Sequence, residues 1–98
     1  MLNNHQKAFL KNKANALRPL YQIGKNLLGE TQLDLLDKGL KAKELIKISV
    51  LKSAENPIEG IAIDLSMKLQ AEVVQIVGRI ITLYRANPHL PHRIELPR

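Results

Sequence analysis

The chain has 98 residues, with 15 lysines and arginines against 9 acids, so its net charge is +6. A hydrophobic content of 45% is too high for a disordered tail, and the length suits one domain with a modest core. Because the chain has no cysteine, disulfides, thiol nucleophiles and cysteine-ligated metals are excluded. No segment is typical of a membrane helix or a signal peptide, and we expect a cytoplasmic protein.

Positive charge is concentrated toward both ends of the chain. Residues 1–29 contain five basic residues and no acid, whereas the middle of the chain is slightly acidic. This asymmetry is typical of a protein with a polyanionic partner, most often a nucleic acid, and a solubilising surface explains the charge equally well. The aromatic residues are only Phe9, Tyr21 and Tyr84. We therefore expect the protein to bind a nucleic acid mainly through the charge of the phosphate backbone and not through base stacking.

The first predicted element is a helix over residues 4–17. Asn4 can cap its start, and Pro19 ends it because proline lacks the N–H and excludes helical geometry before it. Helical spacing assigns the buried stripe to Leu10, Ala14 and Leu17.

A short strand, a loop and a second helix should follow. The strand covers residues 20–23, and the loop, bounded by glycines, covers residues 24–29. The helix is expected over residues 30–40, where acidic residues favour its positive N-terminal end. The apolar positions that repeat along it are Leu33, Leu36 and Leu40.

The next predicted pair is a strand over residues 45–51 and a third helix. Alternating apolar positions indicate a strand with one buried face. Asn56 is expected to cap the third helix, with Pro57 in its first turn and Glu59 completing a capping box. This helix should end near Leu69, and its apolar face comprises Ile58, Ala62, Leu65 and Leu69.

A hairpin and a tail complete the chain. Strands over residues 73–77 and 80–85 should join at the turn Gly78-Arg79. The proline-containing tail, residues 86–98, is expected to be irregular, although residues 93–96 could pair at a sheet edge. The predicted fold class is thus α/β of the α+β type, with the elements in the order α-β-α-β-α-β-β. We expect one domain, whose core covers residues 4–85 and whose four-stranded mixed sheet is covered by helices.

No residue pattern predicts catalysis, a cofactor or a metal site. His89 and His92 lie in the tail without a third ligand nearby, and His5 is close to the N-terminus. Residues 24–31 approach the phosphate-binding loop of nucleotide hydrolases, but Glu30 stands where the essential lysine belongs and would repel phosphates. We therefore expect no enzyme and no small-molecule substrate.

The sequence resembles a known family through motifs that occur in order with the family's spacing. They are Leu10-Lys11 with Ala14, Leu17 and Pro19; Gln22-Ile23-Gly24-Lys25; Glu44-Leu45-Ile46-Lys47; and Val74-Gln75-Ile76-Val77-Gly78-Arg79 leading to Leu83-Tyr84-Arg85. The family is that of the bacterial YhbY proteins, which are single CRM domains (chloroplast RNA splicing and ribosome maturation). The resemblance covers residues 5–85, and the last three residues of the chain also fit.

The resemblance implies a fold related to the C-terminal domain of translation initiation factor three. It also implies non-enzymatic binding to ribosomal RNA in precursors of the large ribosomal subunit. The family's RNA surface centres on a GxxG loop flanked by a basic first helix. Here the loop is Gly24-Lys25-Asn26-Leu27, so leucine replaces the second glycine and puts the close backbone approach to RNA in question. A second departure is Asn15, where the family commonly has histidine.

From residues and resemblance together we expect a monomer that binds RNA without contacting a membrane. The candidate RNA-binding residues are Lys7, Lys11, Asn15, Arg18, Gly24, Lys25, Asn26 and Leu27, with Arg79 and Arg85 as weaker candidates. Lys13 and Lys47 remain open, because each is equally typical of a solvated surface. The alternative hypothesis is a protein-interaction module that reaches ribosomal particles through a protein partner, for which Leu27 and Leu28 in the loop would be suited.

Overall fold

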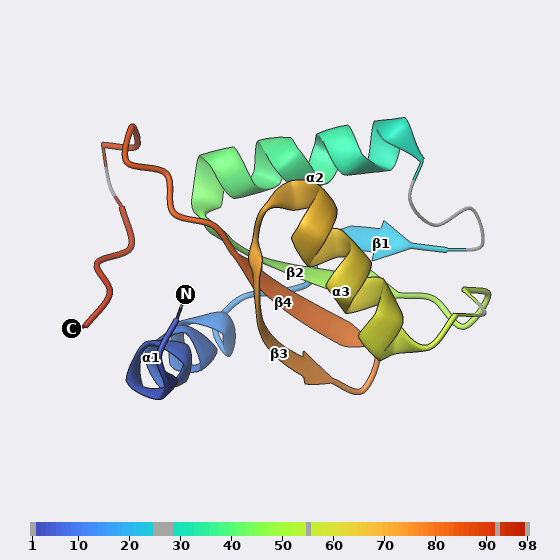
Figure 1. Ribbon diagram of the computed structural model, residues 1–98, viewed down its shortest axis with the longest axis horizontal. Coiled ribbons are helices and arrows are strands. Elements are labelled where there is room, and N and C mark those ends of the chain that lie inside the picture. The colour runs from blue at the N-terminus through green and yellow to red at the C-terminus, as the bar shows by residue number, and fades with distance from the viewer. Residues whose placement is uncertain (1, 25–28, 55, 92, 98) are drawn as a thin grey trace.

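The computed structural model describes residues 2–24, 29–54, 56–91 and 93–97. Over these residues the fold contains three helices and a four-stranded mixed sheet (Figure 1), which confirms the predicted class and element order. The elements are α1 (Asn4–Ala14), β1 (Tyr21–Ile23), α2 (Glu30–Lys43), β2 (Leu45–Val50), α3 (Ile58–Leu69), β3 (Glu72–Val77) and β4 (Ile80–Tyr84).

The strands lie in the order β1-β2-β4-β3. β1 runs parallel to β2, whereas β4 is antiparallel to both β2 and β3. The β1 ladder begins with Tyr21 opposite Ile48 and ends with Ile23 opposite Val50, so β1 pairs with only the second half of β2. The hairpin between β3 and β4 turns at Gly78, whose φ of 58° favours glycine.

The sheet separates two apolar clusters. The larger one lies between the sheet and the helices α2 and α3, and the alternating residues of β2 point into it as predicted. Its most deeply buried members are Ile23, Leu40, Ile48, Leu65, Ile81 and Leu83. The smaller cluster contains Leu10 and Ala14 of α1, and it fixes this helix against the other face of the sheet.

The starts of α1 and α3 and the ends of α1 and α2 differ from the prediction. The cap of α1 is Asn3, whose side chain accepts the N–H of Gln6 while the Gln6 side chain accepts the N–H of Asn3. At α3 the cap position is Pro57 and no side chain caps the helix, so the predicted capping box from Asn56 is wrong. The helix α2 continues to Lys43, beyond the predicted end.

The first helix is also shorter than predicted. It ends at Ala14, because the chain must leave the helix to cross toward β1, and the N–H of Leu17 then turns back to the carbonyl of Ala14. Leu17 is consequently 38% exposed and is not part of the buried stripe, whereas Leu10 and Ala14 are fully buried.

The tail is irregular as expected, but it is attached to the domain. Among the described residues it forms no strand at positions 93–96, and Ile94 and Leu96 pack instead against the cluster beneath α1. The attachment depends on Glu44, which follows α2 and is only 1% exposed. Its carboxylate accepts the N–H groups of Asn87 at 2.8 Å and Ile94 at 2.7 Å.

We expect Glu44→Gln to loosen the tail. The amide has one acceptor oxygen in place of two, so a buried N–H of Asn87 or Ile94 loses its partner, which costs about 1–3 kcal/mol. Hydrogen exchange of these two amides should accelerate, and the free energy of unfolding should fall. The matched control is Glu95→Gln, an exposed position of the same tail. Unchanged exchange at both amides would contradict the anchoring role of Glu44.

Candidate nucleic-acid interface

One face of α1 carries polar side chains that are free to meet a ligand. Lys7, Lys11 and Asn15 follow one another at intervals of four residues. They lie beside Leu10 and Ala14, the residues of α1 that are buried against the sheet. Lys11, Asn15 and the following Arg18 are exposed, and Lys7 is half-buried. Among the described residues, none of these four side chains has a hydrogen bond or an ion pair within the protein. Their donors are therefore available to phosphate oxygens.

The two lysines that the sequence left open have partners. Lys13 lies over the ring of Phe9, with its Nζ 5.4 Å from the ring centroid. Lys47, on β2, reaches the segment that joins α1 to β1 and donates from Nζ to the carbonyl of Leu17 at 3.3 Å. Neither contact neutralises the charge, because neither partner is an acid. Both lysines thus still contribute positive potential to this face of the molecule.

The glycine loop begins where β1 ends. Gly24 is half-buried, and a Cβ there would lie 3.4 Å from Cδ1 of Leu51 and 3.6 Å from Oγ of Ser53, which are ordinary contacts. The predicted site residues Lys25, Asn26 and Leu27, together with Leu28, lie outside the described residues. The structure therefore places the start of the loop beside the turn that follows β2.

Arg79 holds that same turn in place. Its Nε donates to the carbonyl of Val50 and its Nη2 to the carbonyl of Leu51, both at 2.8 Å. In return, the Arg79 carbonyl accepts the N–H of Val50 at 2.8 Å. Nη1 has no partner among the described residues. Arg79 is thus a structural residue that supports the Gly24 end of the sheet and still has a donor to offer there.

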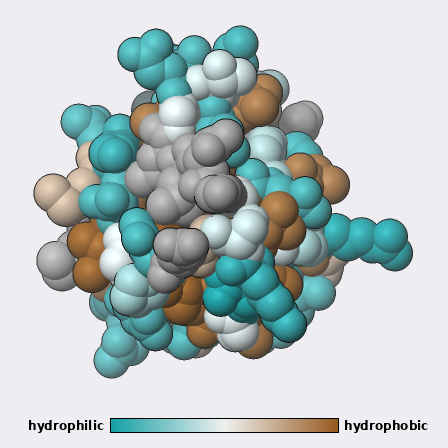
Figure 2. Space-filling model, turned by 90° about the vertical axis from the view of Figure 1, so that its right-hand side faces the viewer, coloured by the Kyte–Doolittle hydropathy of each residue, from teal (hydrophilic) through white to brown (hydrophobic). Residues whose placement is uncertain are grey.

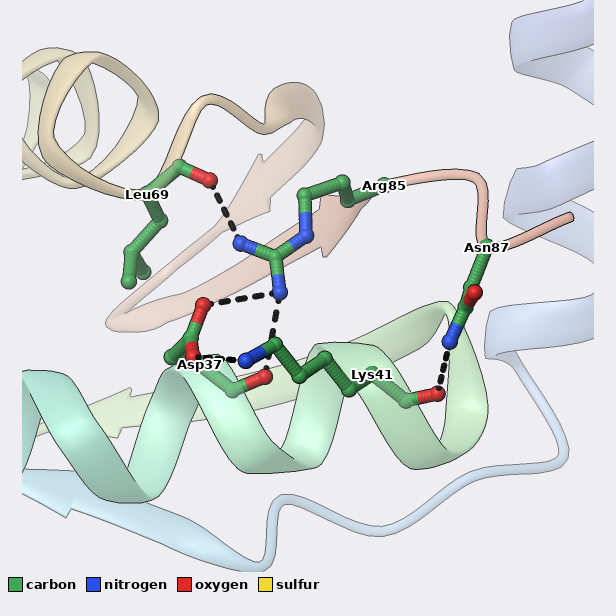
Figure 3. Close-up of polar contacts among 5 residues, drawn as sticks. All are labelled: Asp37, Lys41, Leu69, Arg85 and Asn87. Atoms are coloured by element: carbon green, nitrogen blue, oxygen red, sulfur yellow. Dashed lines mark hydrogen bonds and ion pairs between the residues drawn. The ribbon is translucent and has the colours of Figure 1, made fainter. Parts of the chain in front are cut away.

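Arg85 is committed to the fold itself (Figure 3). Its Nη1 donates to the carbonyl of Leu69 at 2.7 Å, and its Nη2 contacts both the carbonyl of Asp37 at 3.1 Å and the carboxylate of Asp37 at 2.9 Å. These contacts connect the end of β4 with the end of α3 and the middle of α2. We therefore assign Arg85 a structural role and do not count its guanidinium among the charges free for RNA.

The carboxylate of Asp37 lies between two cations. Hydrogen bonds from Lys41 and then Arg85 hold the pKa of Asp37 below its ordinary value of 3.8. The Lys41 Nζ is 3.1 Å from the carboxylate, one helical turn along α2. Because the pKa is lower in the folded state than in the unfolded chain, the ionised carboxylate stabilises the fold at every pH above the pKa of the unfolded chain. This stabilisation is lost as the pH falls through the pKa of the folded state.

Asp37→Asn should remove this part of the pH dependence. We expect the variant to be less stable than the wild type at neutral pH, and the difference to shrink as the pH falls below 3.8. Urea unfolding at a series of pH values measures both quantities. Asp34→Asn is the control, because Asp34 is exposed on the same helix and has no ion pair among the described residues. A difference that stays constant with pH would contradict the role of the ionised carboxylate.

The candidate residues form an extended surface and not a single pocket. In Figure 1, α1 and the Gly24 end of β1 lie toward opposite ends of the long axis, in a molecule measuring 38 × 24 × 23 Å. Arg18 and Lys47 belong to the region between them. Figure 2 faces the Gly24 end, where hydrophilic side chains surround the atoms drawn in grey and apolar ones are scattered among them. This arrangement suits contacts along a polymer more than the enclosure of a small molecule.

Catalytic or metal chemistry has no support in the part of the chain that is described. These residues include no cluster of three metal-ligating side chains, and no helix among them is long and apolar enough to cross a membrane. His5 and His89 are exposed, and His92 is outside the described residues. The deeply buried carboxylate of Glu44 is occupied by backbone N–H groups.

Sequence reasoning did not identify two charged residues near this surface. Lys43, the last residue of α2, is exposed and lies close to Arg18 and Lys47 around a small hollow. Glu44, the next residue, anchors the tail. The only signal for Glu44 was its place in the motif Glu44-Leu45-Ile46-Lys47, which contributed to the family resemblance without revealing a role.

Comparisons with known proteins agree with the fold and the resemblance. The CRS1 / YhbY (CRM) domain model matches residues 2–85. "Probable RNA-binding protein YqeI" of Bacillus subtilis is 36% identical over 97 residues, covering 99% of this chain and 100% of that protein. An "RNA-binding protein" of Haemophilus influenzae is 35% identical, covering 99% of this chain and 96% of that one.

A solved structure gives the same result. The solution structure of the hypothetical protein SAV1595 from Staphylococcus aureus has a TM-score of 0.82 and 35% sequence identity, covering 99% of this chain and 100% of that chain. The likeness to initiation factor three stays a prediction. The chain belongs to the CRS1 / YhbY (CRM) domain family.

Proposed function

We propose that this protein binds RNA through the backbone phosphates, without catalysing a reaction. The observation that carries the proposal is the division of its cations into two groups. Lys7, Lys11 and Arg18 have no partner among the described residues, whereas both terminal nitrogens of Arg85 bond within the protein. The relatives named as RNA-binding proteins support the same class of partner.

The position of the free cations favours an extended partner. They run from α1 through the segment that follows it, and the Gly24 end of the sheet adds Arg79 beyond them. No acid occurs in residues 1–29, so this segment places no carboxylate of its own among its cations. Such a surface reads the shape and charge of a nucleic acid more than its sequence, because base-stacking aromatics are few.

Ribosomal RNA in large-subunit precursors is the partner that we propose within this class. The family resemblance of the motifs supports it, and a cytoplasmic site of action goes with it. The loop that begins at Gly24 would add contacts to those of α1, with Lys25 and Asn26 following the glycine in the sequence. We propose that the protein acts as a monomer.

Reversing the charge of α1 tests the proposal. In a titration of a large-subunit ribosomal RNA fragment, Lys7→Glu/Lys11→Glu should weaken binding at low salt by tenfold or more. Each lost phosphate contact should also reduce the slope of log K against log salt by about 0.7–0.9, so the double variant should lose roughly 1.5. Fluorescence anisotropy at several salt concentrations gives both quantities.

The matched control is Lys38→Glu/Lys68→Glu, which changes the net charge equally on the exposed surfaces of α2 and α3. This control should retain most of the wild-type affinity. Equal losses in both double variants would show a generic polycation and no α1 site. Binding of duplex DNA as tight as that of RNA would contradict the choice of RNA. An absence of RNA binding by the wild type would overturn the proposal and favour a protein partner.

A further inference from the structure

A small hollow lies where the segment after α1 meets the start of β2. We call it the junction pocket, and its volume is about 90 Å³. Its walls are mainly apolar and include Leu17, Leu20 and Leu45. At roughly 30 Å³ for each water molecule, it has room for about three waters, or for part of one planar ring, but not for a stack of rings.

The rim of the junction pocket is positively charged. Arg18, Lys43 and Lys47 all line it, and no acidic residue does within the described part of the chain. Arg18 and Lys43 are exposed, and Lys47 is held toward the pocket by its hydrogen bond to the carbonyl of Leu17. Three cations around an apolar hollow suit a ligand that joins a flat apolar body to an anionic group.

The pocket also borders an unpaired strand edge. The N–H of Val50 bonds to the carbonyl of Arg79, just before β4, and the carbonyl of Glu44 accepts the N–H of Arg85, just after β4. The even-numbered residues of β2 therefore direct their backbone polar groups toward β4. The N–H and C=O of Leu45 therefore point to the opposite side, where β1 has not yet begun, because its ladder starts at Ile48. Leu45 is only 3% exposed, however, so it forms an apolar wall of the pocket and does not present its backbone groups to a ligand.

The far wall of the pocket is rigid. Tyr21, another lining residue, packs against Gly39 of α2 so closely that a Cβ at Gly39 would lie 2.7 Å from Cζ of the ring. The segment between Leu17 and Tyr21 is further restricted by Pro19. The hollow is therefore largely formed before any ligand arrives, which lowers the entropic cost of binding.

We propose that the junction pocket receives the base of a single unpaired RNA nucleotide, whose phosphate contacts Arg18, Lys43 or Lys47. Part of the base ring would lie against Leu17 and Leu20, which are exposed, and the rest of the base would stay at the rim of the pocket. This inference rests on the proposed function, and it adds selection for unpaired over paired RNA. The occupant is a nucleotide because Arg18 continues the free cations of α1, so a strand bound there passes the pocket.

A titration with ribonucleoside monophosphates tests the pocket without requiring the RNA function. Methyl resonances of Leu17, Leu20 and Leu45 in the full chain should shift and saturate, while inorganic phosphate should leave them in place. Leu20→Asp and Lys43→Glu should each weaken nucleotide binding by about fivefold or more, since each places negative charge at the pocket. Leu20 is 65% exposed, so its substitution should preserve the core.

Matched controls are Ile63→Asp, at an apolar position of α3 that is 57% exposed, and Lys38→Glu on α2. Neither should change nucleotide binding. Methyl shifts that are absent, or that phosphate alone reproduces, would overturn the pocket proposal.

A second measurement compares an RNA hairpin containing an unpaired loop with a fully paired RNA. The wild type should prefer the hairpin by at least severalfold, and Leu20→Asp should lose this preference, because its affinity for the hairpin falls further than its affinity for the paired RNA. A preference that survives Leu20→Asp would overturn the pocket. Failure of the wild type to bind either RNA would overturn the proposed function instead. The nucleotide titration would then show by itself whether the junction pocket binds a nucleotide.

Discussion

The backbone and carboxylate of Glu44 join the end of α2 to the end of β4 and to the tail, which are distant from it in sequence. Its N–H bonds to the carbonyl of Leu40 and ends α2, its carbonyl accepts the N–H of Arg85 beyond β4, and its carboxylate holds two amides of the tail. A buried charge is costly unless it is hydrogen-bonded, so these contacts are required and not incidental. Burial, together with the charge of Glu44, also raises the pKa of Tyr84 in the cluster beneath α1. Leu45 and Tyr84, which pack against α1 in that cluster, directly follow Glu44 and directly precede Arg85 in the sequence.

The use of each cation follows from where the fold places it. Arg85 and Arg79 lie at opposite ends of β4 and donate to carbonyls at the ends of neighbouring elements, where backbone oxygens lack partners. The lysines of α1 lie on a helix whose buried side is narrow and whose remaining surface faces solvent. Net charge alone does not distinguish these two groups, although the lysines of α1 are free to meet a phosphate, whereas Arg79 has only its Nη1 to offer and Arg85 is committed to the fold. The proposal for RNA therefore depends on the geometry more than on the value of +6.

Local patterns predicted the elements well, and tertiary contacts explain what they missed. The alternation in β2 and the glycine turn at Gly78 specified the sheet, and both are features of neighbouring residues. The exposure of Leu17 depends on where the chain must go after α1, which helical spacing does not contain. The partners of Arg85 belong to α2 and α3, and those of Glu44 belong to the tail, so no short motif reveals them. The family resemblance named the basic helix and the loop, but it did not show which arginines the fold itself uses.

The central claim is that RNA meets the face that carries α1 and the segment after it. The most direct measurement is a comparison of backbone amide spectra with and without a ribosomal RNA fragment. The account predicts the largest shifts along residues 4–18 and around Lys47, and none on the outer face of α3 at Ile63 and Met67. Shifts that concentrate on α3, with α1 unchanged, would contradict the account.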